Sequence, residues 1–374
     1  RKKDRMKTRI CHFMIAFLIA AAVFSGQCGI ISAGAQNGGA NAYPEDFAWA
    51  TVSSPVTDNL NSVDMVSANE GWAVGENGTV LHYDGMNWTQ FSAPVTATTR
   101  LDALSMSSAV NGWAIGQDNT PPFYAIILRW NGTAWEAVPV PSPPWPVALQ
   151  DVSVPNESSA WIGGGVFVCA LGPPPCTPEA AFGTILHWDG NEWIFYSISN
   201  TFLSSISMLS DTDGWAVGVE VDQTTKQQRS RILHWNGISW TAVDHPITEY
   251  PAGSIHFILE EVTALNANMA WSAVSGNHQF LRWDGSSWTA INSPVSGRPS
   301  IAVLSSDNAW AVGDEGDIGH WDGHFWNSIN SPVTSTLTAV SMVSAFDGWA
   351  VGNGGVLLHG SQAALHFYLP CVSK

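Results

Sequence analysis

The sequence has few cysteines and few charged side chains. It contains 5 Cys among 374 residues, and charged residues make up 12% of it. No C-x-x-C pair is present, so a zinc site of that spacing is excluded. No Gly-x-Ser-x-Gly, P-loop or His-Glu-x-x-His motif occurs either. After residue 35, no ten-residue stretch has helical periodicity. We therefore expect an all-β protein without a cofactor or metal, and not an enzyme.

Basic residues are scarce. Lys and Arg number 14 against 31 Asp and Glu, and the formal net charge is −17. Residues 1–35 hold six of the basic residues and one acid, so the rest of the chain has a net charge near −22. Phosphate backbones and anionic lipid surfaces are bound through Lys and Arg. We therefore expect no nucleic-acid partner and no binding to anionic membranes.

The N-terminal segment has the pattern of an export signal. A basic stretch, Arg1 to Arg9, precedes the apolar run from Phe13 to Phe24, and Ala33-Gly34-Ala35 forms an A-x-A cleavage site. The run is short for a membrane span. We expect a signal peptide at 1–35, a linker at 36–44 and a secreted, monomeric mature chain without a membrane span. The alternatives are an uncleaved anchor or lipidation at Cys28. Either Met6 is the true first residue of the protein, or the sequence is a fragment of a longer one.

A repeat explains the high tryptophan content, 20 Trp against 6 Tyr. Gly-Trp-Ala-Val-Gly at residues 71–75 recurs in seven strong or weak copies. Before each Trp lies a stretch in which apolar and polar residues alternate. One apolar residue of that stretch precedes the Trp by nine positions in every repeat: Val63–Trp72, Leu104–Trp113, Val152–Trp161, Ile206–Trp215, Val262–Trp271, Ile301–Trp310 and Val340–Trp349. A second motif, Asp/Asn-Gly-x-x-Trp, follows in six repeats. Its Gly accepts the positive φ of a tight hairpin turn.

Each repeat predicts four short antiparallel strands, A to D, with the Trp of the first motif in B and the turn between C and D. Seven such units predict a seven-bladed β-propeller. We place it at 45–360, with blades near 58–100, 101–147, 148–201, 202–252, 253–298, 299–335 and 336–360, and a tail at 361–374. A strand near 47–56, around Trp49, is expected to complete the last blade and close the ring. The alternative is that Leu365–Leu369 forms that strand.

Variation between repeats concentrates on one face. The distance from the strand B Trp to the C–D turn runs 12, 18, 28, 21, 13 and 12 residues. B–C and D–A connections leave the same end of an antiparallel blade, so the long connections of blades 2 to 5 share a face. We predict that this face binds a ligand, through the aromatic residues Phe123, Tyr124, Trp145, Phe167, Phe182 and Tyr250. The alternative is neutral variation in loop length. Cys169 and Cys176 are expected to form a disulfide in one of these loops.

The recurring side chains of strands B and C are interpreted as structural. The strand B tryptophans and Trp49 are expected to pack between blades. Strand C carries His or Arg at one position of every repeat, and we expect these side chains to bond adjacent blades: His82, Arg129, His187, His234, Arg282, His320 and His359. Equivalent strand C positions lie too far apart to share a zinc ion. In the pair Glu260-Glu261, alternation is expected to point the side chains apart. The run Asp314-Glu315-Gly316-Asp317 is interpreted as a B–C turn, with a Ca²⁺ loop as the alternative.

The run from Val340 to His359, like that from Val63 to His82, resembles the BNR-type repeats of photosystem II assembly (stability) factor-like propellers. The resemblance covers Trp49 to His359 and implies a non-enzymatic scaffold that binds other proteins. Strand C here is mostly His where that family is expected to have Arg, so an arginine-lined partner site is not implied. The sialidase Asp-box spaces its Asp and Trp by five positions, whereas they are four apart here.

We therefore expect a binding propeller with a protein or glycan ligand. The alternatives are a BNR- or sialidase-like glycoside hydrolase or lyase, and a lectin. An enzyme of this kind would gather carboxylates with an Arg or Tyr in the central pocket.

Overall fold

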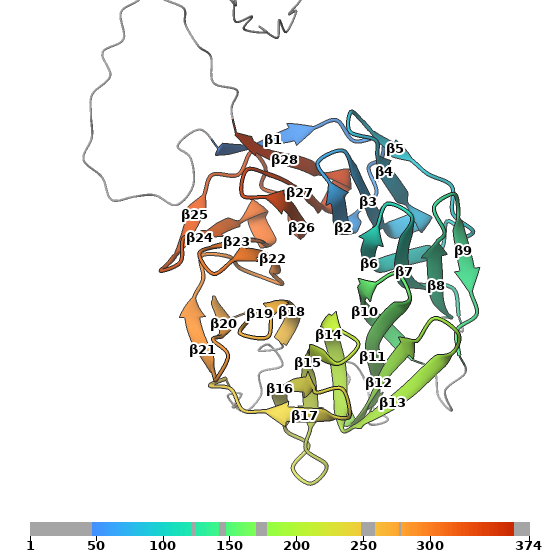
Figure 1. Ribbon diagram of the computed structural model, residues 1–374, viewed down its shortest axis with the longest axis vertical. Helices are drawn as coiled ribbons and strands as arrows, with labels where there is room; N and C mark the ends of the chain where they lie inside the picture. The colour runs from blue at the N-terminus through green and yellow to red at the C-terminus, as the bar shows by residue number, and fades with distance from the viewer. Residues whose placement is uncertain are drawn as a thin grey trace, which may run out of the picture. The chain divides into compact units, whose positions relative to one another are not determined.

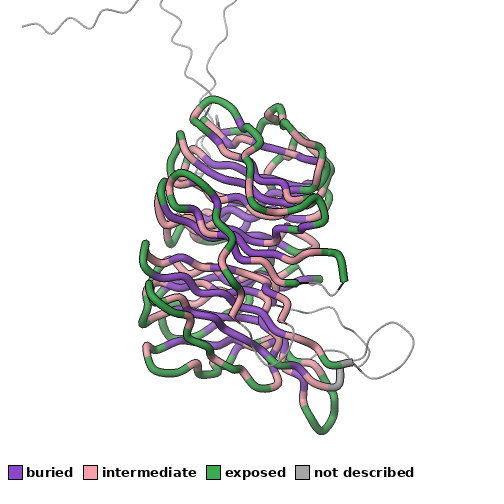
Figure 2. Tube along the Cα trace, turned by 90° about the vertical axis from the view of Figure 1, so that its right-hand side faces the viewer, coloured by how far each residue is buried: buried purple, intermediate pink, exposed green. Residues whose placement is uncertain are grey.

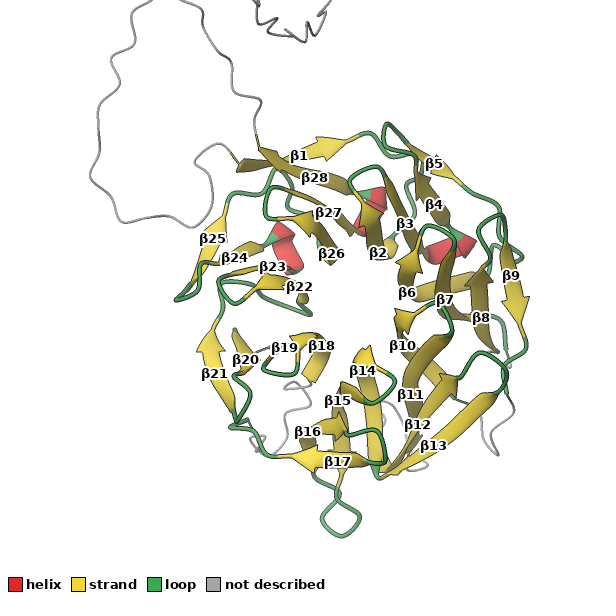
Figure 3. Cartoon of the chain, viewed as in Figure 1, coloured by secondary structure: helices red, strands yellow, loops and turns green. Residues whose placement is uncertain are grey.

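The computed structural model describes residues 47–121, 124–141, 147–169, 178–247, 259–276 and 278–362. These residues form seven four-stranded antiparallel sheets. The sheets stand around a common axis as the blades of a propeller (Figure 1). Within the described residues, helix is limited to three short 3₁₀ turns (Figure 3). The predicted fold class is confirmed. No helix in the described part is long and apolar enough to cross a membrane.

Each blade runs from an inner strand A to an outer strand D. Blade 1 consists of β2 (Leu60–Ser67), β3 (Glu70–Gly75), β4 (Val80–Tyr83) and β5 (Trp88–Gln90), and blade 2 of β6 (Thr99–Ser108), β7 (Asn111–Asp118), β8 (Ala125–Trp130) and β9 (Trp135–Val138). Blade 3 consists of β10 (Ala148–Asn156), β11 (Ser159–Cys169), β12 (Pro178–Trp188) and β13 (Trp193–Ser199), and blade 4 of β14 (Thr201–Ser210), β15 (Asp213–Val221), β16 (Gln228–Trp235) and β17 (Trp240–Val243).

Blades 5 to 7 follow the same order. Blade 5 consists of β18 (Leu259–Asn266), β19 (Met269–Val274), β20 (Gln279–Trp283) and β21 (Trp288–Asn292), and blade 6 of β22 (Ser300–Ser305), β23 (Asn308–Val312), β24 (Ile318–Trp321) and β25 (Trp326–Ile329). Blade 7 consists of β26 (Leu337–Ser344), β27 (Asp347–Gly352), β28 (Leu357–Gln362) and β1 (Phe47–Val52).

The N-terminal strand closes the ring, as predicted. Strand β1 pairs antiparallel with β28, in a register that runs from Phe47 opposite Gln362 to Val52 opposite Leu357. The last blade therefore takes three strands from the C-terminal part of the chain and one from the N-terminal part, which leaves no blade incomplete. The alternative strand, Leu365–Leu369, lies outside the described residues.

Turn chemistry explains why the C and D strands form hairpins. Asp84 Oδ1 accepts hydrogen bonds from the backbone N of Met86, at 2.9 Å, and of Asn87, at 2.8 Å. Gly85 between them has a φ of 89°, a conformation that costs glycine little. The same Asx arrangement recurs at Asn131, Asp189, Asn236, Asp284 and Asp322.

The core lies between the blades, where the strand B tryptophans sit. Trp72 is fully buried and contacts Trp130 and Trp135 of the next blade, with ring centroids 4.6 and 5.4 Å apart. Trp310 contacts Trp49 of the closing strand at 5.7 Å in an edge-to-face arrangement. Figure 2 shows the buried residues along the strands, with exposed residues gathered at the turns. Each large indole therefore joins two neighbouring sheets.

The long B–C connections of blades 2 to 4 are partly strand rather than loop. Gln117 pairs with Ala125, Val166 with Phe182, and Glu220 with Arg229. The inserted residues continue the antiparallel ladder, because pairing satisfies backbone groups that a loop would leave to water. The predicted loop that holds Cys169 and Cys176 is therefore strand at its two ends. Its central residues, 170–177, lie outside the described part of the chain.

Candidate functional site

The structure describes three of the six predicted ligand-binding aromatics, and these three do not line one common cavity. Phe123, Trp145 and Tyr250 lie outside the described residues, as does Cys176 of the predicted disulfide. Tyr124 is 67% exposed just before β8, and Phe182 is 38% exposed on β12; neither lines the cavities described below. Phe167 does line one of them. Of the three described aromatics, the structure thus brings Phe167 alone to a cavity.

The imidazoles of strand C bond within their own blade. His82 Nε2 lies 2.8 Å from Glu70 Oε1, and the pairs His234–Asp213 and His359–Asp347 have the same separation. The prediction that these side chains join adjacent blades is wrong for these three. Strand C pairs directly with strand B, so each ring lies over the Trp opposite it and reaches a side chain at the start of strand B.

Three other members of the strand C set have a partner in the next blade or in the indole beside them. His187 bonds Ser159 of its own blade at 3.1 Å and lies 3.9 Å from Asp211 of the next blade. The Arg129 guanidinium lies 5.4 Å from the Trp113 ring centroid. Arg282 lies over Trp271 and, at 5.7 Å, over Trp321 of the next blade.

His320 makes the stability of the fold sensitive to acid. Its ring is fully buried and lies 4.5 Å from that of Trp310. Burial lowers the pKa of His320 from 6.5 to about 4, against the opposing charge of Asp322. The folded state disfavours the protonated ring. His320 therefore does not lower the free energy of unfolding above pH 6.5, and it lowers that free energy progressively as the pH falls toward 4.

We expect His320→Gln to reduce this acid sensitivity. Between pH 6.5 and pH 4, the free energy of unfolding of the variant should fall by roughly 1–3 kcal/mol less than that of the parent. Urea unfolding at several pH values measures the difference, and His324→Gln at an exposed turn is the control. Parallel pH profiles for parent and His320→Gln would contradict the assignment.

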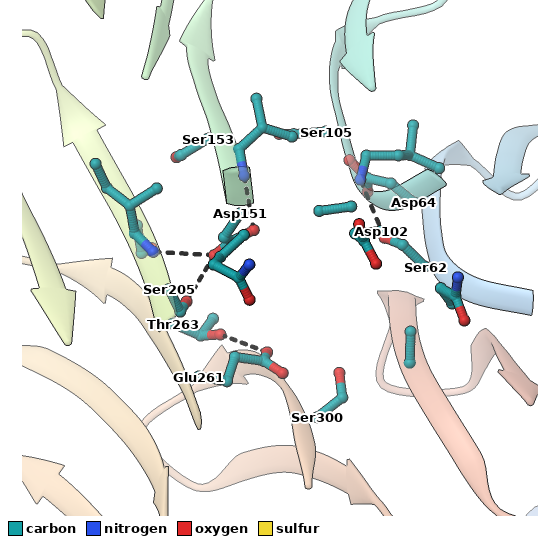
Figure 4. A pocket seen from close by; sticks show the side chains of 18 of the residues that line it. Ser62, Asp64, Asp102, Ser105, Asp151, Ser153, Ser205, Glu261, Thr263 and Ser300 are labelled. Atoms are coloured by element: carbon teal, nitrogen blue, oxygen red, sulfur yellow. Dashed lines mark hydrogen bonds between the residues drawn. The ribbon is translucent and has the colours of Figure 1, made fainter. Parts of the chain in front are cut away.

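The central cavity lies among the innermost strands. It has a volume of about 380 Å³ and is lined by strand A residues of all seven blades (Figure 4). Five carboxylates lie on its wall, on four strands: Asp64 on β2, Asp102 on β6, Asp151 on β10, and Glu260 and Glu261 on β18. No Lys, Arg or Tyr is among the described residues that line it. Sequence reasoning did not predict this site.

A bulge in strand A explains why adjacent side chains share the cavity. The pairing of β18 with β19 shifts register between Leu259 and Glu261, which leaves Glu260 as the extra residue. Glu260 and Glu261 therefore both line the cavity, and the prediction that they point apart is wrong. Equivalent shifts follow the first Leu of strand A in blades 1, 2, 3, 4 and 7. In blades 1, 3, 4 and 5 two adjacent polar residues follow that Leu and mark the bulge in the sequence, but the expectation of strict alternation assigned them to opposite faces.

Side chains on the cavity wall also hold the blades together. Strand A is an edge strand, so its inner backbone N–H groups need acceptors. In ten places among the described residues, a Ser, Asp or Glu of one blade accepts a hydrogen bond from a backbone N of the next blade. These acceptors, which we call the inner belt, are Ser62, Asp64, Ser105, Asp151, Ser153, Ser205, Ser207, Glu261, Ser300 and Ser341.

The belt is continuous across the chain's closure. Ser341 Oγ on β26 accepts from Met65 N on β2 at 3.0 Å, which links the last blade to the first. Ser205 is bonded to both neighbouring blades: its Oγ donates a hydrogen bond to Asp151 Oδ2 at 2.6 Å and accepts one from Val262 N at 3.1 Å. Asp64, Asp151 and Glu261 thus occupy positions that serine occupies elsewhere, and they have a structural role.

Burial raises the pKa of every carboxyl in the cavity. It raises the pKa of Asp64 and of Asp102 to about 6 and that of Glu261 to about 7, with a further rise from the nearby charge of Asp151. The pKa values of Asp151 and Glu260 are also raised by burial. These carboxyl groups therefore release their protons at a higher pH than free carboxyl groups do.

A second, smaller cavity of about 190 Å³ adjoins the first and shares Gln150, Ser204 and Glu260 with it. Its apolar wall is Phe167, Phe202 and Val219. The Phe167 and Phe202 rings are stacked with centroids 4.4 Å apart. Arg298 completes the lining. We call this smaller cavity the rim groove.

The rim groove lies on the face that carries the long connections. Gln150, Phe202 and Glu260 are near the starts of strands A, while Phe167 and Val219 are near the ends of strands B. Both kinds of strand terminus meet the B–C and D–A connections. The sequence-predicted face and the predicted residue Phe167 therefore meet the central cavity at this groove.

The acidic B–C turn of blade 6 has no feature of a metal site. Asp314 Oδ1 accepts from Thr336 Oγ1 at 3.2 Å, and Asp317 Oδ2 accepts from Ser296 Oγ at 2.6 Å. The turn is the 3₁₀ segment Asp314–Gly316. Among described residues, no group of three or more His, Cys, Asp or Glu side chains is arranged to hold a metal ion.

Comparison with known proteins identifies the fold. No family model and no curated protein matches the chain. Among solved structures, it is similar to YCF48 bound to D1 peptide, with 17% identity, 86% of this chain and 97% of that chain covered, and a TM-score of 0.62. It is also similar to YCF48 from Cyanidioschyzon merolae, at 20% identity over 84% and 99% of the two chains and a TM-score of 0.57.

A third similar structure is streptogramin B lyase, at 12% identity over 84% and 98% of the two chains and a TM-score of 0.60. At these identities the likeness concerns the fold. The resemblance expected from the repeats is confirmed at that level: the chain is a seven-bladed β-propeller with the fold of the YCF48 photosystem II assembly factors.

Proposed function

We propose that the chain is a non-enzymatic, extracytoplasmic propeller that binds a protein ligand at the rim groove. The observation that carries the proposal is the position of the groove. Phe167 and Phe202 form an aromatic wall on the face that carries the B–C and D–A connections. Binding residues are commonly placed on connections held by a rigid scaffold.

Two further observations support a protein ligand. YCF48, a propeller of this fold, is described as bound to D1 peptide. The rim groove, at about 190 Å³, is smaller than the roughly 300–1,000 Å³ of pockets that enclose small molecules. It suits one side chain of a larger ligand. The proposed location outside the cytoplasm rests on residues 1–35 alone.

Removing the aromatic wall should weaken capture of the ligand. We expect Phe167→Ala to reduce ligand affinity by about tenfold or more, because loss of a buried aromatic contact costs on the order of 2 kcal/mol at a binding hot spot. Pull-down of the full chain and a glycan array, each repeated with the variant, measure this. Ile238→Ala, at an exposed C–D turn, is the control on the opposite face.

The β11–β12 hairpin, which carries Phe167, provides a second test. Replacing residues 169–179 by Asn-Gly would join Val168 to Ala180, which are paired in the ladder, with a two-residue turn. Unchanged binding in both this variant and Phe167→Ala would refute the choice of face. Binding of glycans alone would favour the lectin.

The second candidate function is a glycoside hydrolase or lyase. The observation in its favour is the group of five cavity carboxylates, one of which, Glu261, has a pKa near 7, suited to a general acid. Against it, no described Arg or Tyr lines the central cavity, and three of the five acids are held by the inner belt. Turnover of chromogenic glycosides that is lost in Glu261→Gln would establish the enzyme.

A further inference from the structure

We infer that the ligand at the rim groove presents an arginine or lysine side chain to Glu260, in the place that the protein's own Arg298 occupies in this structure. The inference rests on the proposed function and specifies the ligand's chemistry. It has three supports: the pairing of Arg298, the distribution of charge, and the shape of the groove.

The pair between Arg298 and Glu260 is weakly held. Arg298 Nε lies 3.5 Å from Glu260 Oε1, and the arginine side chain is 80% exposed whereas that of the glutamate is 17% exposed. Ion pairs with an exposed partner contribute little, because water and salt screen them and the long side chain loses entropy. A ligand that covers the groove would exclude water from an ion pair between its own guanidinium and Glu260. Because that pair would be screened less than the exposed pair of Arg298, the ligand's guanidinium can replace Arg298.

Charge in and around the cavity favours a cation. Arg298 is the only Lys or Arg among the described residues lining either cavity, against five carboxylates. The equivalent carboxylate of blade 2, Asp102, already holds a guanidinium, since Arg100 Nε lies 2.6 Å from its Oδ1. Glu260 has a side-chain hydrogen bond from Ser275, which orients it. The position after the first Leu of strand A is thus a guanidinium-binding position in two blades.

The groove is shaped for one basic side chain with an apolar stem. Phe167, Phe202 and Val219 supply its apolar lining, and Glu260 supplies a carboxylate. Lys and Arg bury their methylene stems along apolar surface while the charged group meets a partner, and a guanidinium is also attracted to an aromatic face. A free divalent cation does not fit this arrangement, because no metal-ligating group of three is formed by the described residues.

The test begins with a random nonamer peptide array probed with the full chain. We expect bound peptides to be enriched in Arg or Lys next to an apolar residue. The best peptide is then synthesised with its basic residue intact and with citrulline, the neutral analogue of arginine, in that position. Binding of both peptides to parent and variants is measured by fluorescence anisotropy.

Two substitutions should act in opposite directions. Glu260→Gln should weaken binding of the basic peptide by about tenfold or more, since hydrogen bonds to charged groups contribute about 1.5–3 kcal/mol, and should leave the citrulline peptide unaffected. Arg298→Ala should strengthen binding of the basic peptide up to about fivefold, because it removes a competitor held by about 1 kcal/mol at most.

Matched controls separate this effect from general attraction to an acidic protein. Glu157→Gln, at an A–B turn on the opposite face, and Arg231→Ala, outside the groove lining, make the same changes of charge and should alter affinity less than twofold. Equal effects of Arg298→Ala and Arg231→Ala would overturn the inference, as would bound peptides that lack basic residues while still requiring Phe167. If the array binds no peptide and pull-down captures no protein, the proposed function itself fails.

Discussion

Trp49→Ala should lower the free energy of unfolding by about 3–5 kcal/mol, the usual cost of truncating a buried tryptophan. Trp49 is 5% exposed and lies on β1, which is held to the last blade by pairing with β28 and to blade 6 by contact with Trp310. Its loss leaves a cavity at the point where the two ends of the propeller meet. Urea unfolding followed by tryptophan fluorescence measures the change.

The equivalent tryptophan of blade 1 provides the control. Trp88 is 4% exposed and occupies the same position relative to strand C, but a hairpin connects its strand to the rest of the blade. Both variants should lose stability, whereas local opening, seen as proteolysis near residues 53–59, is expected for Trp49→Ala alone. A loss below about 1 kcal/mol for Trp49→Ala, with the normal loss for Trp88→Ala, would show that β1 does not hold the ring closed.

Glu261→Gln should stabilise the protein above neutral pH. Burial raises the pKa of Glu261 from 4.5 to about 7, so the folded state favours the protonated carboxyl. Stability from this group is therefore unaffected below pH 4.5, falls as the pH rises toward 7 and stays reduced above it. Glutamine keeps the oxygen that accepts the Ile301 N–H without the buried charge.

At pH 8 we expect the Glu261→Gln variant to be more stable than the parent by about 1–3 kcal/mol, less than the full linkage value because the side chain retains some solvent contact. At pH 4.5 the two should be equal. Thermal or urea unfolding at both pH values measures this. Glu157→Gln, at an exposed turn, is the control. A variant less stable than the parent at pH 8 would show that ionised Glu261 is well compensated by its neighbours.

Much of the fold could be predicted because its determinants are local and repeated. The fixed nine-residue separation from Val63 to Trp72, and its six copies, define the A–B hairpins, and the Asp-Gly turns define the C–D hairpins. Closure by β1 was predictable because Trp49 lacks preceding A, B and C strands in the sequence.

The central cavity was missed because its geometry depends on an irregularity. A single bulge residue such as Glu260 brings two consecutive side chains to one surface, and a strictly alternating strand pattern assigns them to opposite surfaces. The partners of the inner belt, such as Asp64 and Met106, are 42 positions apart, and only the curvature of the assembled ring brings them together. The partner of His82 was predicted in the wrong blade for a related reason. The register between strands B and C places Glu70 beside His82 in the same blade, and the sequence pattern does not show that register.

The pairing of Phe47 with Gln362 has a consequence for how the protein can be immobilised. Strand C ends at the C–D turn, so β28 finishes, and β1 begins, on the side of the disc opposite Phe167 and Glu260. A bead, a sensor chip or a fusion partner attached at either of these positions would leave the face with the aromatic wall turned toward the solution.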